Sequence, residues 1–168
     1  MQRKLGVNAT QRLALIKNQA SELLWYGKIT TTEARAKEVA SYVAKIITLA
    51  VNTYTDTVES EVKVTDAKGK EVTKKVIKDG PKKLNARRKI MSLTYDLQFV
   101  KENGESKAEF KARTKGINHP LIEKIFNEIA PKYAERKQEL GQGGGYTRKY
   151  LKGQRRGDAA EVAIIELV

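Results

Sequence analysis

The side chains best suited to chemistry lie near the C-terminus, where basic and aromatic residues follow a run of glycines. Residues 146–158 hold five Lys or Arg residues and no acid before Asp158, and Tyr146 and Tyr150 lie among them. Lys and Arg neutralise phosphates, and the planar guanidinium of Arg also stacks on exposed bases. For a single residue, an ordinary sheet tyrosine or a solvated charge explains the pattern equally well. The window as a whole indicates contact with nucleic acid.

The glycine run at 141–145 raises the question of a nucleotide-binding loop. A P-loop needs Gly-x-x-x-x-Gly-Lys-Ser/Thr between a strand and a helix, because successive amides and a lysine must surround the phosphates. Here no Gly-Lys-Ser/Thr follows, and the next segment is typical of a strand. We therefore expect a flexible loop at 141–145.

Residues able to carry catalysis or bind a metal are scarce. The chain has no cysteine, which excludes thiolate nucleophiles and cysteine zinc sites. Its one histidine, His119, precedes Pro120 at an expected helix start and is best interpreted as an exposed cap-region residue. Glu59 and Glu61 share one face of a strand, where a solvated edge is the plainer interpretation. We predict no enzyme activity, no metal, no cofactor and no small-molecule substrate.

The composition supports a basic, folded protein. The 168 residues carry 33 Lys and Arg against 20 Asp and Glu, a net charge of +13, and 40% of them are hydrophobic. That length predicts a single domain spanning 1–168. So large a positive charge indicates a polyanionic partner, and nucleic acid is the commonest one. No apolar run approaches the roughly 20 residues of a membrane span, and the first residues lack a signal-peptide pattern, so we expect no membrane contact and a cytoplasmic location.

Helical periodicity and turn residues predict the elements of the first part of the chain. Residues 1–9 are a basic arm, and a helix follows over 10–26, with Thr10 as its N-cap and Gly27 at its end. Residues 28–32 are β-branched and strand-like. Thr30 and Glu33 form a possible capping box for a second helix, whose apolar stripe covers 39–50.

Two charged excursions are predicted in the middle of the chain. Residues 52–83 are read as an insertion that contains a β-hairpin, and 98–118 as a second, partly helical one. Between them a helix is expected over 82–97, with Leu84, Met91, Tyr95 and Leu97 facing the interior.

The last part of the chain is predicted to hold one helix and a hairpin. Asn118 and Pro120 open the helix, and Pro131 ends or kinks it. Strands at 146–152 and 163–168 then pair as a hairpin with a basic tip.

Short motifs in a particular order make the chain similar to a known family. They lie at 3–6, 11–12, 29–38, 47–50, 85–88, 126–131, 144–148, 155–159 and 165–168. Each is weakly specific alone, but together and in this order the chain resembles bacterial large-subunit ribosomal protein seventeen, the L-seventeen family. The resemblance implies an α+β fold with several helices on a small mixed β-sheet.

The same resemblance implies a structural role on the large ribosomal subunit. The partners would be large-subunit ribosomal RNA and neighbouring ribosomal proteins near the exit of the peptide tunnel. By motif match and charge, the expected RNA-binding residues are Arg3, Lys4, Arg12, Lys17, Arg35, Arg87, Arg88, Tyr146, Thr147, Arg148, Lys149, Arg155 and Arg156.

Two other functions remain open at this point. A free-standing nucleoid or RNA-chaperone protein would share the charge but bind unrelated duplexes equally well. A small nucleic-acid-processing enzyme would need paired carboxylates and a divalent metal, and the sequence shows no such motif.

Overall fold

The computed structural model describes residues 4–65 and 71–168, with side chains throughout except in 62–65 and 71–74. Its first helix, α1, spans Ala9–Tyr26. The Asn8 side chain accepts a hydrogen bond from the Gln11 amide at 2.8 Å, so Asn8 is the N-cap and the expected cap Thr10 lies inside the helix. Gly27 ends α1 as predicted, with a left-handed φ of 80° that favours glycine. The predicted arm is therefore shorter, and residues 1–3 lie outside the described chain.

A short strand connects α1 to the central helix. Strand β1 is Lys28–Thr32, and α2 follows at once as Glu33–Val51. The predicted capping box is wrong, because Thr30 lies within β1 and the N-cap Thr32 makes no side-chain cap bond. The strand holds Thr30 in an extended conformation, two residues before the observed N-cap.

The main sheet is antiparallel throughout its described strands. Its order is β1-β5-β4, where β4 is Thr147–Gln154 and β5 is Glu161–Leu167. Ile165 of β5 pairs with Ile29 of β1 on one side and with Lys149 of β4 on the other. The α+β class and the basic-tipped hairpin are confirmed, but the sheet is not mixed. Both β1 and β4 pair with β5 in the antiparallel direction. For β4 this follows from the hairpin that connects it to β5.

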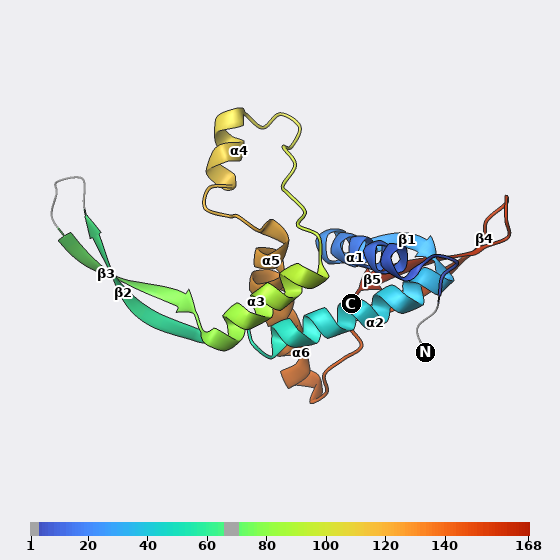
Figure 1. Ribbon diagram of the computed structural model, residues 1–168, viewed down its shortest axis with the longest axis horizontal. Helices are drawn as coiled ribbons and strands as arrows, with labels where there is room; N and C mark the ends of the chain where they lie inside the picture. Colours follow the sequence, from blue (N-terminus) through green and yellow to red (C-terminus); the bar gives the residue numbers. More distant parts are fainter. Residues whose placement is uncertain (1–3, 66–70) are drawn as a thin grey trace.

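The core forms around α2, which crosses the middle of the molecule (Figure 1). Buried side chains of α2 repeat at three- and four-residue spacing, from Val39 to Ala50. They meet Leu23 and Leu24 of α1 and Ile165 of β5, all fully buried. Burying an aliphatic side chain of this size contributes about 1.5–3 kcal/mol, so this apolar stripe holds helices and sheet together.

Helix α3 ends earlier than its sequence indicates. It spans Pro81–Leu93 rather than 82–97, because the backbone at Thr94 is extended. The Tyr95 amide then donates a hydrogen bond to the Ser21 hydroxyl at 2.8 Å. Its inward face is Ala86 and Ile90. The predicted inward residues are wrong: the exposed fractions of Leu84, Met91 and Tyr95 are 40–45%, and Leu97 is half-buried in the following loop.

The expected helix after Asn118 continues past its proline. It comprises α5, Pro120–Lys124, a π-helical segment η1, Ile125–Ile129, and α6, Ala130–Leu140. Pro131 lacks an N–H and its ring would meet the carbonyl four residues earlier. The wider π turn immediately before Pro131 relieves that conflict, so the helix does not end there.

Two excursions project from the body, as predicted (Figure 1). One is the antiparallel hairpin of β2, Thr57–Thr65, and β3, Glu71–Asp79; its predicted turn at 66–70 lies outside the described residues. The other contains α4, Lys107–Arg113, which begins with a Ser106–Glu109 capping box. Phe99 fastens this lobe to the body, since its ring lies 5.5 Å from that of Trp25.

Candidate nucleic-acid interface

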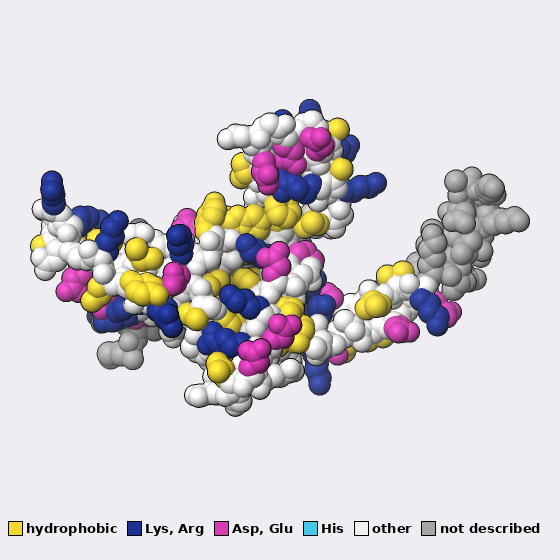
Figure 2. Space-filling view, turned by 180° about the vertical axis from the view of Figure 1, so that it is seen from behind, with side chains coloured by type: hydrophobic (Ala, Val, Ile, Leu, Met, Phe, Trp, Pro, Cys, Tyr) yellow, Lys and Arg dark blue, Asp and Glu magenta, His cyan; other side chains and the backbone are white. Residues whose placement is uncertain are grey.

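The fold gathers several predicted binding residues at one end of the molecule. Residues 4–8, the first turns of α1 and α2, and the β4–β5 hairpin lie together there (Figure 1), and Lys and Arg side chains are prominent on the rear face of this end (Figure 2). Lys149 of β4 donates to Glu33 of α2 at 2.6 Å, which fastens the hairpin to the start of α2. Segments more than 100 residues apart in sequence therefore form one basic surface.

Some predicted cations remain available on this surface. Within 4–65 and 71–168, no acidic side chain forms an ion pair with Lys4, Arg12, Arg35, Arg148 or Arg156, and we call these five residues the basic end. Lys4, Arg148 and Arg156 are exposed, whereas Arg12 and Arg35 are half-buried. Tyr150 raises the pKa of Arg148, and Glu166, opposite Arg148 across the β4–β5 pair, raises it as well. Arg3 lies outside the described residues.

Another predicted cation, Arg87, is already neutralised by acids of two other elements. Arg87 forms a forked pair with Glu123, at 2.7 and 3.1 Å, and its Nε lies 2.6 Å from an Asp79 oxygen. The hydrogen bond to Glu123 raises the pKa of Arg87, and that to Arg87 lowers the pKa of Glu123. With 18% of its side chain exposed, Arg87 joins α3 to α5 and the β3 end. Arg88, the next residue, is exposed and has no acidic partner in the described chain.

The remaining predicted cations also have partners within the chain. Lys17 donates to the Ser92 carbonyl at 2.5 Å, which attaches α1 to the end of α3. Arg155 donates from Nε to Asp158 at 2.8 Å in the turn of the β4–β5 hairpin. That bond lowers the pKa of Asp158 to about 2. Lys149 has a similar effect on Glu33, whose pKa also falls to about 2 because Lys149 and Lys37 both bond it.

Tyr146 lies in the core rather than on the surface. Only 7% of it is exposed, its ring meets Tyr133 edge-on at 5.0 Å, and its carbonyl accepts from the Tyr133 hydroxyl. Thr147 is half-buried at the start of β4. The exposed aromatic ring of this strand is Tyr150, with 45% of its surface accessible. Base stacking on β4 is therefore open to Tyr150 and closed to Tyr146.

Three exposed lysines on α2 and α3 were not among the predicted binding residues. Lys82 and Lys89 of α3 and Lys45 of α2 form no ion pair with any described residue. A signal was present, since residues 81–93 hold five Lys or Arg residues and no acid. A helix with that composition indicates an anionic partner.

The glycine loop at 141–145 is held in place by an arginine. Arg136 donates from Nη2 to the carbonyls of Gly144 and Gly145 at 2.8 and 3.0 Å. The loop thus points carbonyl oxygens at a cation, whereas a phosphate site needs amide N–H groups directed inward. This geometry favours a tethered connection over the flexible loop we expected.

Features of a catalytic or metal site do not assemble in the described part of the chain. His119 is the N-cap of α5, as its position predicted, but it is half-buried rather than exposed, and its Nδ1 lies 2.9 Å from an Asp96 oxygen. No group of three or more His, Cys, Asp or Glu residues within 4–65 and 71–168 is placed to hold a metal. None of the helices in those ranges has the length and apolarity to span a bilayer.

Comparison with known proteins reveals similarity over nearly the whole chain. Residues 15–168 match the family model described as ribosomal protein L17. A large ribosomal subunit protein bL17 from Lachnospira eligens is 40% identical over 185 aligned positions, covering 99% of this chain and 98% of the relative. The bL17 proteins of Acetivibrio thermocellus and Clostridium botulinum strain Loch Maree are each 38% identical, covering 99% of this chain and 98% and 96% of the relatives.

Proposed function

Because the chain belongs to the ribosomal protein L17 family, and is therefore a structural constituent of the bacterial large ribosomal subunit and not an enzyme, we propose that it binds large-subunit ribosomal RNA near the exit of the peptide tunnel. Family membership also places it in the ribosome, in the cytoplasm. The proposal assigns the RNA contacts to the basic end and to Arg88 of α3.

The observation that supports RNA binding is the division of the cations into two kinds. Arg87, Lys149 and Arg155 are paired with acids and stabilise the fold, whereas the basic end forms no salt bridge in the described chain and only Arg148 has an acid, Glu166, opposite it. Unpaired cations repel one another unless an external anion neutralises them. Phosphate contacts made by these side chains release counterions from RNA, so affinity should fall steeply with salt.

The shape of the molecule is consistent with bridging folded RNA. The β2–β3 hairpin, the α4 lobe and the β4–β5 tip leave the body in three directions (Figure 1). A two-stranded hairpin is marginal by itself in water, so we infer that β2–β3 packs on a neighbouring protein or RNA segment in the subunit. Deleting residues 57–79 should leave the core intact but change the cross-links to its neighbours; unchanged neighbours and assembly would contradict this inference.

The test uses the purified full-length chain with transcripts of large-subunit ribosomal RNA. We expect tight binding at low salt, strong preference over an unrelated RNA of equal length, and co-sedimentation with large subunits through a moderate salt wash. Equal affinity for unrelated duplexes, with no enrichment in ribosomes, would instead indicate a free-standing nucleoid or RNA-chaperone protein.

The tunnel-exit position needs a separate measurement, because it comes from the family resemblance. A cross-linker placed at exposed Arg156, on the β4–β5 tip, should react with proteins that surround the exit in intact large subunits. Cross-links only to proteins far from the exit would exclude this position while leaving RNA binding untouched.

A further inference from the structure

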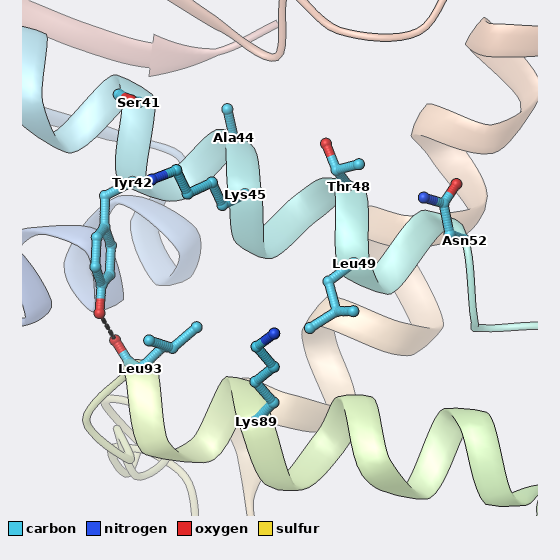
Figure 3. Close-up of a pocket in the computed structure, with 9 residues that line it drawn as sticks. All are labelled: Ser41, Tyr42, Ala44, Lys45, Thr48, Leu49, Asn52, Lys89 and Leu93. Atoms are coloured by element: carbon cyan, nitrogen blue, oxygen red, sulfur yellow. Dashed lines mark hydrogen bonds between the residues drawn. The ribbon is translucent and has the colours of Figure 1, made fainter.

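A groove lies between α2 and α3, apart from the basic end (Figure 3). Its volume is about 810 Å³, within the roughly 300–1,000 Å³ of small-ligand sites. Tyr42 and Leu49 of α2 point toward α3, and Leu93 and Lys89 of α3 point back (Figure 3). The groove thus has an apolar lining with at least one cation directed into it.

One aromatic ring in this groove has a fixed orientation. The Tyr42 hydroxyl donates to the Leu93 carbonyl at 2.9 Å, which joins the two helices and closes one end of the groove. Burial raises the pKa of Tyr42, so the hydroxyl keeps its proton and the bond persists over the ordinary pH range. A ring held in this way loses little conformational entropy when a flat ligand stacks on it.

The charges around the groove have one sign. Lys45 and Lys89 line it from opposite helices and are exposed, and no acidic side chain occurs among its lining residues in the described chain. Thr48 and Asn52 project from the side of α2 that faces away from α3 (Figure 3), and the Thr48 hydroxyl donates to the Tyr146 hydroxyl at 3.3 Å. A matching occupant carries negative charge and has a flat apolar face.

We propose that the α2–α3 groove receives one unpaired nucleotide from a single-stranded stretch of the subunit's RNA. Its base lies against Tyr42, and its phosphate is neutralised by Lys45 and Lys89. Unstacked bases in loops and bulges are recognised by stacking on aromatic side chains and by hydrogen bonds to their edges. This inference rests on the proposed function, since it names the RNA feature that a second surface of the same chain recognises.

The chemistry favours a nucleotide over an acidic peptide. An amphipathic helix docks through a continuous apolar strip of anchors at i, i+3, i+4 and i+7. The large apolar side chains here are only Tyr42, Leu49 and Leu93, with a lysine beside them on each helix. That combination provides a place for one ring and one phosphate.

The first experiment measures the preference of the full-length chain for bases over the bare backbone. The probes are a single-stranded oligoadenylate and an abasic sugar-phosphate of equal length, compared by fluorescence anisotropy. Tyr42→Leu should reduce the preference for oligoadenylate by about fivefold or more, because an aromatic–base stack is lost. Tyr42→Phe keeps the ring and loses only the hydrogen bond, so it should retain the preference; circular dichroism checks that both variants fold.

Charge is tested by a matched pair of double variants. Lys45→Ala with Lys89→Ala should weaken binding of both probes, whereas Lys75→Ala with Lys78→Ala, which removes the same charge from exposed positions of β3, should have a smaller effect. Photo-cross-linking with 4-thiouridine-substituted large-subunit RNA should place adducts in peptides covering 41–52 or 89–93.

Three outcomes overturn the inference. Adducts confined to other peptides, with ribosomal RNA still bound, exclude the groove and leave the proposed function standing. Equal loss in Tyr42→Leu and Tyr42→Phe assigns Tyr42 a structural role. Binding of a glutamate-rich peptide that depends on Lys45 and Lys89, without any preference for bases, makes the groove a protein-docking site. Failure of the wild-type chain to bind ribosomal RNA at all, with the oligoadenylate preference intact, would instead refute the proposed function.

Discussion

Replacing Arg12, Arg35 and Arg148 with alanine removes three cations that form no salt bridge with a described acid, although Glu166 attracts Arg148 from the opposite strand. Each phosphate contact contributes about 0.7–0.9 to the slope of log affinity against log salt. If all three contact phosphates, the slope for large-subunit RNA should fall in magnitude by roughly 2–3. Because none of the three holds elements together through an ion pair, the free energy of unfolding should change little.

The matched control removes the same charge from residues whose acidic partners lie in the chain. Arg87→Ala, Lys149→Ala and Arg155→Ala together should change the salt slope less, since these cations are already neutralised. They should instead destabilise the fold. Arg87 contributes most, because its removal leaves the partly buried Glu123 carboxylate without its forked partner, a loss of about 1–3 kcal/mol.

Filter binding over a series of salt concentrations gives the slope, and urea denaturation gives the free energy of unfolding. The distinction between free and paired cations would be refuted if both triple variants lowered the slope equally. An unchanged slope in the Arg12, Arg35 and Arg148 variant would show that the RNA contacts lie elsewhere on the chain.

Three further predictions concern stability. The pKa of Glu33 is about 2, so the stability it contributes is present above its ordinary value of 4.5 and is lost as pH falls toward 2; Lys149→Ala should flatten the decline in melting temperature over this range. Ile90→Ala should lower the free energy of unfolding by about 2–5 kcal/mol in urea titration, because it leaves a cavity under α3. A loss below about 1 kcal/mol would contradict this, since it would mean that neighbouring side chains move in to fill the cavity. Ser106→Ala should speed amide exchange of Glu109 and the rest of α4 while sparing α2, since the cap supports a helix of only seven residues; equal exchange would contradict the importance of the capping box.

Several elements could be predicted from local signals. The apolar periodicity of 10–26 and the glycine that follows lead to α1, because an amphipathic stripe and a left-handed C-cap depend on near neighbours only. The alternation around 57–77 likewise leads to the β2–β3 hairpin. The N-cap of α1 was predicted at Thr10 but is Asn8, two positions earlier. Both residue types are good caps, and only the folded backbone decides which of the two is extended.

The length and inward face of α3 required the tertiary structure. Leu84 and Met91 have the spacing of a buried face, yet the buried residues of α3 are Ala86 and Ile90. The helix also stops where Ser21, 74 residues away, accepts the Tyr95 amide. Neither contact leaves a trace in the neighbouring sequence.

The positive charge of the chain, and hence its affinity for a polyanion, was determined by composition. Which of the predicted cations are free was decided largely by folding, because Lys149 and Arg87 are neutralised by acids from distant parts of the chain. Lys149 meets Glu33 across 116 positions, and Arg87 meets Glu123 across 36. Ion pairing depends on separation in space rather than in sequence, so the tertiary structure selects the surface left for RNA.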